Sequence, residues 1–229
     1  MAWFGRKKAA KQKLEPFDYV IATGDRWMVL PQPGERVNLG DWARETVALR
    51  SGEFDDADTV TNGDLERVAT QLAGWAQIHQ DGGPSEWGLV LVVEASFGVE
   101  GYITVRGAEF DSSFTRAEDV ERYDMHSTPL VGERFTEVVE LPAGRAGHSF
   151  SVRESSFGGF EGQVRNDDWY VCVEPEHVVI LFHAEWVSPG ADDMMTLGLR
   201  EMVKQLEIVS ARPRETPPAT PSPKPPSAP

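Results

Sequence analysis

The chain has 229 residues, of which 40% are hydrophobic and 10% aromatic, and its formal net charge is −15 at pH 7. This composition is sufficient for a folded core and argues against a wholly disordered chain. The single cysteine, Cys172, excludes an internal disulfide framework, and there is no run of about 18 uncharged apolar residues that would predict a spanning helix.

The first thirteen residues form a basic arm that carries a charge of +5 before the first acid, Glu15. Two aromatic and five basic side chains define this arm: Trp3, Phe4, Arg6, Lys7, Lys8, Lys11 and Lys13. In a secretory signal, about 7–15 apolar residues follow the charges, whereas here the aromatics come first. We therefore expect a cytoplasmic protein. The arm either contacts an anionic partner or the inner membrane face, or is simply solvated.

Helical periodicity occurs in three segments, residues 40–50, 64–80 and 191–208. Asp41 and Asp64 are the candidate caps of the first two. In the third, Asp192 and Asp193 fall in the first turn and Lys204 near the end, which suits the helix dipole. Residues 115–123 give a weaker helical signal.

The remaining apolar runs predict strands, most of them consecutive and joined by turns. They cover residues 17–21, 26–30, 87–95, 102–106, 135–141, 150–153, 169–174 and 177–187. In the last run, alternate residues from Val178 to Trp186 are all apolar, so this face should lie against helices. The pattern predicts an α+β fold, a mainly antiparallel sheet packed by helices, in one domain over residues 14–210.

Two glycine-containing stretches resemble each other, residues 96–101 (SFGVEG) and 156–162 (SFGGFEG). Both follow an expected strand. They are interpreted as hairpin turns in which glycine supplies a positive φ, or alternatively as paired ligand loops.

The best candidate for a catalytic or metal site is the pair His183 and Glu185, which project from one face of a strand. An imidazole and a carboxylate there could bind a divalent metal or share a proton. His177 lies about 20 Å away along an unbroken strand, too far to join them. His79, His126 and His148 form no recognisable cluster, and Cys172 is predicted to be a buried strand residue.

Acidic pairs such as Asp167-Asp168 are interpreted as solvated loops. The arm carries +5 and the last segment, residues 211–229, carries +2, so the body of the chain between them has a net charge of −22. Such a body should repel duplex nucleic acid and attract basic partners.

The last segment, residues 211–229, holds eight of the sixteen prolines and no apolar residue larger than alanine outside proline. It cannot bury enough apolar surface to offset the entropy of ordering, so we expect a disordered tail. The tail acts either as a spacer or, because it contains PxxP spacings, as a docking peptide for a partner.

The order of elements in the second half resembles the Mog1/PsbP-like group of small α+β domains. The resemblance rests on strand 135–141, Pro142-Ala143-Gly144, the two strands at 169–174 and 177–187, and the closing helix. It implies an antiparallel sheet sandwiched by helices and a non-catalytic binding or assembly role.

No dinucleotide, P-loop, nucleophile-elbow or zincin motif is present in the sequence, and no cofactor is predicted. The leading hypothesis is a non-enzymatic interaction or assembly module that binds a protein partner. The alternatives are a small metal-dependent hydrolase that uses His183 and Glu185, and an acidic inhibitor that mimics nucleic acid.

Overall fold

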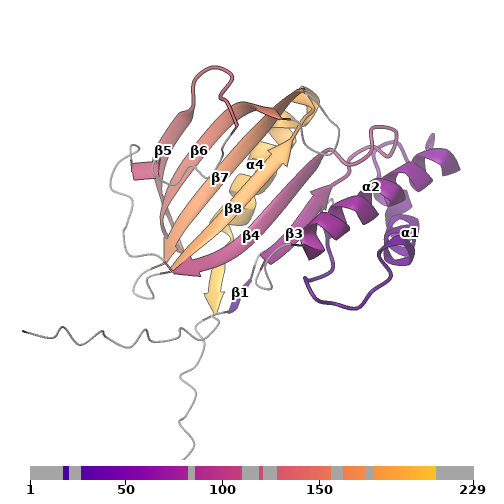
Figure 1. Cartoon of the computed structure of the whole chain (residues 1–229), viewed down its shortest axis with the longest axis horizontal. Helices are drawn as coiled ribbons and strands as arrows, with labels where there is room; N and C mark the ends of the chain where they lie inside the picture. Colours follow the sequence, from indigo (N-terminus) through magenta and orange to yellow (C-terminus); the bar gives the residue numbers. More distant parts are fainter. Residues whose placement is uncertain are drawn as a thin grey trace, which may run out of the picture. The chain divides into compact units, whose positions relative to one another are not determined.

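The computed structural model describes residues 18–20, 27–81, 86–109, 119–120, 128–155, 162–173 and 178–209. It confirms the α+β prediction, with a seven-stranded antiparallel sheet and packed helices in the unit of residues 21–206 (Figure 1). A second unit pairs β1 (Asp18–Val20) with β9 (Glu207–Val209). The basic arm, the proline-rich tail and the second glycine stretch lie outside the described residues.

The seven strands lie in the order β2-β3-β4-β8-β7-β6-β5, and each pairs antiparallel with its neighbours. Their bounds are β2 Trp27–Val29, β3 Glu86–Leu91, β4 Gly101–Glu109, β5 Phe135–Leu141, β6 Gly144–Ser155, β7 Gly162–Val173 and β8 Val178–Trp186. Strands β6 and β7 are longer than their apolar runs because polar side chains continue both ladders.

The first two helices begin earlier than expected, because other residues cap them. Helix α1 (Leu39–Arg50) is capped by Asn38, whose side chain accepts hydrogen bonds from two backbone N–H groups. A short 3₁₀ turn, η1 (Ser51–Glu53), follows α1. In α2 (Asn62–Gln80), Thr61 is the cap, and Asp64 completes a capping box three residues later.

The third predicted helix is shorter than its apolar pattern. A 3₁₀ turn, η3 (Pro189–Ala191), leads into α4 (Asp192–Lys204), which ends at Gln205. Residues 207–209 form β9 instead of a last helical turn, since pairing with β1 satisfies their backbone groups. Leu197, one of the apolar residues in the helical pattern of residues 191–208, is exposed.

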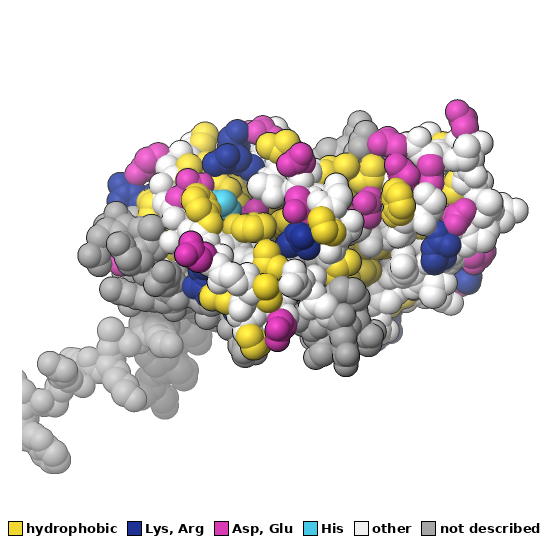
Figure 2. All heavy atoms as spheres, turned by 90° about the horizontal axis from the view of Figure 1, so that it is seen from above, with side chains coloured by type: hydrophobic (Ala, Val, Ile, Leu, Met, Phe, Trp, Pro, Cys, Tyr) yellow, Lys and Arg dark blue, Asp and Glu magenta, His cyan; other side chains and the backbone are white. Residues whose placement is uncertain are grey.

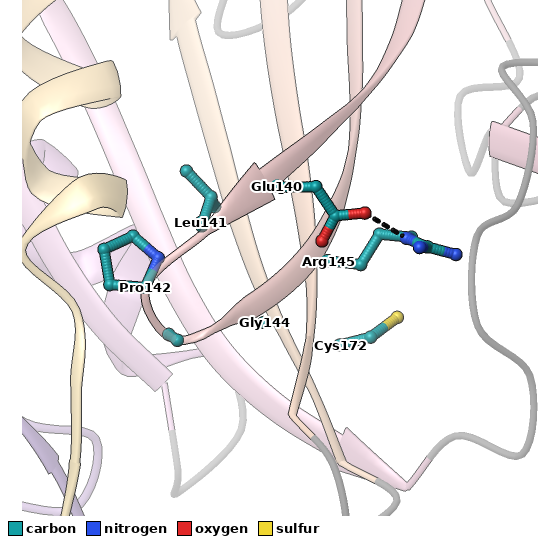
Figure 3. Close-up of a pocket in the computed structure, with 7 residues that line it drawn as sticks. Glu140, Leu141, Pro142, Gly144, Arg145 and Cys172 are labelled. Carbon is teal, nitrogen blue, oxygen red and sulfur yellow. Dashed lines mark hydrogen bonds and ion pairs between the residues drawn. The ribbon is translucent and has the colours of Figure 1, made fainter.

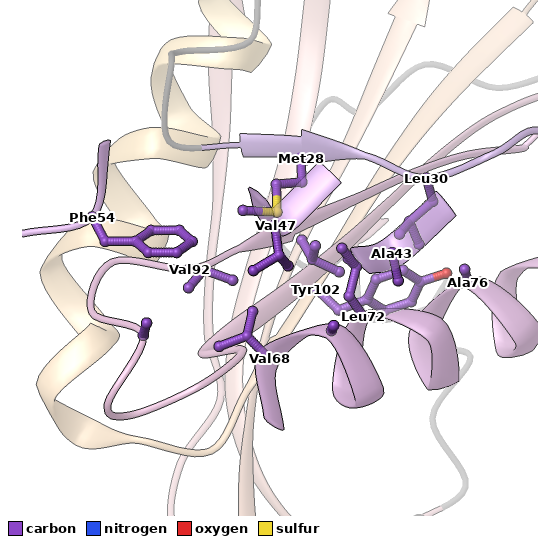
Figure 4. Close-up of a cluster of buried hydrophobic side chains, with 13 residues drawn as sticks. Met28, Leu30, Ala43, Val47, Phe54, Val68, Leu72, Ala76, Val92 and Tyr102 are labelled. Atoms are coloured by element: carbon purple, nitrogen blue, oxygen red, sulfur yellow. The ribbon is translucent and has the colours of Figure 1, made fainter. Parts of the chain in front are cut away.

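Helices α1 and α2 pack at the β2–β4 end of one face of the sheet, here called the α2 face. Val68 and Leu72 of α2 meet Val90 and Tyr102 of the sheet in a hydrophobic cluster of thirteen buried residues (Figure 4). The Trp75 ring stacks on Tyr102 at 4.7 Å. Further along this face, Val120 covers a smaller cluster: Tyr170, Cys172, Val179 and Leu181.

Helix α4 covers the opposite face, here called the α4 face. Its Asp192 carboxylate accepts a 2.6 Å hydrogen bond from the Trp186 indole N–H of β8. Its buried Met195 lies directly over Gly101 of β4. The face of β8 that includes Phe182 and Trp186 is therefore buried against a helix, as the alternation predicts.

The β5–β6 hairpin depends on Gly144, which has a φ of +144°. A Cβ there would overlap the backbone carbonyl oxygen of Cys172. We expect Gly144→Ala to lower the free energy of unfolding by about 1–3 kcal/mol, the usual range for such backbone strain.

The matched control is Gly74→Ala in the middle of α2, where a Cβ would meet nothing within 4 Å. It should raise the free energy of unfolding by about 0.5–1 kcal/mol. Chemical denaturation of both variants checks this, and an unchanged Gly144→Ala variant would contradict the geometry.

Candidate functional site

Asp167 and Asp168 are adjacent in β7 and project to opposite faces of the sheet. Both are buried, although the sequence suggested a solvated loop, and that interpretation is wrong. A buried carboxylate is costly unless a positive charge and hydrogen bonds compensate it. Each of the two aspartates contacts a histidine from a neighbouring strand.

On the α2 face, Asp168 lies opposite His183 of β8 in the strand register. The imidazole Nδ1 lies 2.6 Å from the Asp168 carboxylate and Nε2 lies 3.1 Å from Glu185. We call these three residues the Asp168 cluster. The pair predicted from sequence, His183 and Glu185, is therefore brought together, with Asp168 as a third member.

The Asp168 cluster holds its imidazole in the charged form. Burial alone would lower the pKa of His183, but the charge and hydrogen bond of Asp168, followed by those of Glu185, raise it to about 10. A protonated imidazole donates through both nitrogens and has no lone pair for a metal. No group of three or more His, Cys, Asp or Glu side chains in the described ranges is arranged to hold a metal ion.

On the α4 face, Asp167 forms part of a longer chain of alternating charges. His148 lies 2.8 Å from Asp167 through Nε2 and 3.0 Å from Glu137 through Nδ1. Arg200 of α4 lies 3.4 Å from the same Glu137 oxygen. We call these four residues the Asp167 cluster. It links β7, β6 and β5 to the helix.

Burial opposes the charge on both partners of the buried pair in the Asp167 cluster. Burial raises the pKa of Asp167, although the hydrogen bond and the charge of His148 act to lower it. It would lower the pKa of His148, but Asp167 and then Glu137 outweigh it and raise that pKa. The imidazole also stacks on the Trp169 ring at 4.1 Å, and Arg200 lies over the same ring.

A cavity of about 440 Å³ lies at the β5–β6 hairpin, apart from both clusters (Figure 3). The Glu140–Arg145 ion pair and Cys172 line it, together with the backbone of the turn. The Cys172 residue is buried, as predicted. The surface of this cavity is mostly polar, which is unlike the mostly apolar lining of a typical small-molecule pocket.

The turn at Ser96–Gly98, between β3 and β4, presents the side chain of Phe97 to solvent. This side chain is 69% exposed. The turn is one of the two glycine stretches singled out in the sequence, and Gly98 has the expected positive φ, +87°. The partner stretch lies outside the described residues, so the idea of paired loops stays a prediction.

Side chains of Asp56, Arg67 and Gln71 form hydrogen bonds with the backbone of this turn. The Asp56 carboxylate accepts hydrogen bonds from the N–H groups of Ala95 and Ser96, both at 2.9 Å. Arg67 donates to the carbonyl oxygens of the same two residues, at 3.2 and 2.8 Å. The amide oxygen of Gln71 accepts from the Val99 N–H at 2.9 Å.

Acidic side chains dominate the surface around the turn. Residues 27–100 contain thirteen acidic and four basic residues, a net charge of −9. Figure 2 shows Asp and Glu side chains prevailing over the end formed by α1 and α2. Arg44, Arg50 and Arg67 each form an ion pair with a neighbouring acid, so little positive charge is left unbalanced there.

Sequence reasoning missed both buried aspartates and His148. The Asp167-Asp168 pair looked like any hydrophilic stretch, because strand β7 carries polar side chains on both faces at this point. His148 could have been found from its spacing to Phe150. Residues two positions apart in a strand lie on the same face, so His148 would share the face of this apolar residue. Without the strand register, Glu137 and Asp167 could not be assigned to it.

No family model matches the chain, and no curated protein matches it. Among solved structures, the chain is similar to LpqN of Mycobacterium tuberculosis, described as involved in cell envelope biogenesis. The identity is 9%, the TM-score is 0.41, and 84% of each chain is covered. Similarity at this level carries no conclusion about function. None of the helices in the described residues is long and apolar enough to cross a membrane.

The Asp168 cluster predicts how His183 titrates. Because the folded pKa of about 10 lies above the ordinary value of about 6.5, its contribution to stability is complete below pH 6.5. That contribution is lost as the pH rises from there through about 10. In ¹⁵N-resolved NMR spectra at pH 8, we expect both imidazole nitrogens of His183 to carry protons.

The reference is the same chain in denaturant, where the histidines should titrate near 6.5. A midpoint near 6.5 for His183 in the folded protein would show that the two carboxylates do not hold it charged.

Proposed function

We propose that the chain is a non-enzymatic protein-interaction module that docks a basic partner at the Phe97 turn. The observation that carries this proposal is an aromatic side chain, 69% exposed, on a turn whose backbone is held by Asp56 and Arg67. Buried aromatic anchors dominate many protein–protein interfaces, and an exposed aromatic side chain on a well-held turn can serve as such an anchor.

The hydrogen bonds to the turn support this role because they fix Phe97 before any partner arrives. Binding then costs less conformational entropy than it would with a loose loop. Gly98 contributes as well, because a Cβ there would overlap the amide oxygen of Gln71. Any larger residue would displace either the turn or its Gln71 hydrogen bond.

The charge around the turn indicates the chemistry of the partner. An excess of acidic side chains over α1 and α2 favours a partner with Lys and Arg around an apolar pocket. Such charges increase the rate of encounter, and salt screens them over about 8–10 Å at physiological ionic strength. Binding should therefore weaken as salt is added.

The alternatives gain less support from the geometry. A hydrolase at His183 and Glu185 needs an imidazole nitrogen with a free lone pair, whereas both nitrogens face carboxylates. A nucleic-acid mimic needs an uninterrupted array of carboxylates, whereas arginines are interleaved with the acids of the helical end.

The Mog1/PsbP-like assignment belongs to this proposal as well. It rests on the order of elements in the second half of the sequence, for which the structure supports the coarser α+β fold. A cytoplasmic location, with which the single cysteine is compatible, is part of the same proposal. So is contact of the basic arm with an anionic surface, which its two aromatic and five basic side chains favour.

Phe97→Ser tests the docking turn. With the full chain as bait in lysate of the source organism, we expect this variant to lose a basic partner that the wild type retains. The affinity should fall at least about tenfold, equivalent to 1.4 kcal/mol. Because Phe97 is exposed, the free energy of unfolding should change by no more than about 0.5 kcal/mol.

The control is Leu49→Ser on α1, which removes a side chain that is 82% exposed at a different position. It should leave capture of the same partner unchanged. Equal loss in both variants, or no loss in Phe97→Ser, would contradict docking at the turn.

The basic arm is tested by sedimentation with vesicles rich in phosphatidylserine at low ionic strength. The full chain should bind, and replacement of the five basic residues of the arm by glutamine should abolish binding, since each contributes about 1 kcal/mol. Neutral phosphatidylcholine vesicles serve as the control. Equal binding of both chains would contradict the role of the arm.

A further inference from the structure

Strand β5 lies at the end of the sheet and pairs with β6 on one side only. The Val131 N–H donates to the Val152 carbonyl, and the Glu154 N–H donates to the Pro129 carbonyl. Even-numbered residues of β6 therefore point their backbone groups toward β5. By the antiparallel pattern, Phe135, Glu137, Val139 and Leu141 bond to β6.

The backbone N–H and C=O groups of Thr136, Val138 and Glu140 consequently point away from the sheet. Within the part of the chain that the structure describes, no backbone hydrogen bond satisfies these outward groups. Unpaired groups along an edge are a template for another strand. The opposite edge of the sheet offers much less, because β2 has three residues.

Natural proteins usually block such an edge with charged side chains, above all lysine, or with a proline, a bulge, a very short strand or a covering segment. The β5 sequence, FTEVVEL, contains neither lysine nor proline, and its two glutamates are ion-paired, Glu137 with His148 and Glu140 with Arg145. Its register with β6 is unbroken from Phe135 to Leu141. In addition, Phe135 at one end of the strand is 52% exposed.

We propose that β5 pairs with β5 of a second copy of the chain, antiparallel and centred on Val138. In this register Val138 faces itself, and the outward backbone groups of Thr136 meet those of Glu140. These pairs form about six hydrogen bonds between the copies. The twofold symmetry is the usual one for a homodimer.

The side chains fit this register without placing like charges opposite each other. Phe135 lies beside Leu141 of the second copy, so the exposed ring gains an apolar neighbour. Glu140 faces Thr136. Glu137 faces Val139, and its charge is already balanced by His148 and Arg200.

The contact between the two strands is small. Seven residues of one strand cover less than the roughly 800 Å² per partner of a standard stable interface. The dimer should therefore be weak and should depend on concentration. This inference goes beyond the proposed function, because it concerns a different surface and a different partner, and either can fail alone.

Analytical ultracentrifugation of the full chain over a wide concentration range tests the pairing. We expect the average mass to rise from 25.4 kDa toward twice that value. Thr136→Glu places a like charge opposite Glu140 of the second copy and should weaken dimerisation at least about tenfold. Thr136→Lys places an opposite charge there and should preserve or strengthen it.

The two Thr136 variants replace the same side chain, so a non-specific effect would move both alike. Val138→Pro removes an outward N–H and should abolish the dimer, with thermal unfolding used to confirm that the variant folds. Three results would overturn the proposal: a monomer at every concentration, equal behaviour of the two Thr136 variants, or a dimer that survives Val138→Pro. Another segment or another protein on this edge would give the first result.

Discussion

The constraint on which the rest of the sheet depends is the pair of buried carboxylates at Asp167 and Asp168. Two adjacent charges in an interior strand can be buried only if each face of the sheet supplies a compensating cation. His183 does so on the α2 face and His148 on the α4 face. The sheet is thus held across β6, β7 and β8 by charge as well as by its backbone ladder.

The two clusters also explain the difference between the interior and the surface. In the Asp168 cluster both imidazole nitrogens face carboxylates, and the same is true of His148 in the Asp167 cluster. Groups that look reactive in the sequence are therefore used to position strands. Within the described residues, the two features that we propose for recognition lie at the surface instead: the turn at Phe97 and the outer edge of β5.

The sequence predicted much of the fold because apolar periodicity follows burial. Strand β5 was predicted to the residue, and the buried face of β8 was predicted from its alternation. The helix caps were misplaced because both helices begin before the aspartates that look like caps. Leu39 and Gly40 precede Asp41, and Asn62-Gly63, a typical turn signal, precedes Asp64. Beyond Lys204, strand pairing overrode helical periodicity, a tertiary effect that no local pattern contains.

The candidate site was predictable only in part. His183 and Glu185 are two residues apart, so strand geometry alone placed them together. Asp168 joins them from another strand, and that contact follows from the β7–β8 register rather than from spacing. The exposure of Phe97 is also tertiary, since Asp56 and Arg67 reach its turn from other parts of the chain.

A double-mutant cycle on Asp168 and His183 measures whether buried charge pairs hold the sheet together. The free energy of unfolding is measured for the wild type, Asp168→Asn, His183→Gln and the double variant. Removal of one partner should cost about 3–5 kcal/mol, since it leaves an uncompensated buried group. We expect a coupling energy of about 1–3 kcal/mol between the two residues. Additive effects of the two substitutions would show that the ion pair does not hold the strands.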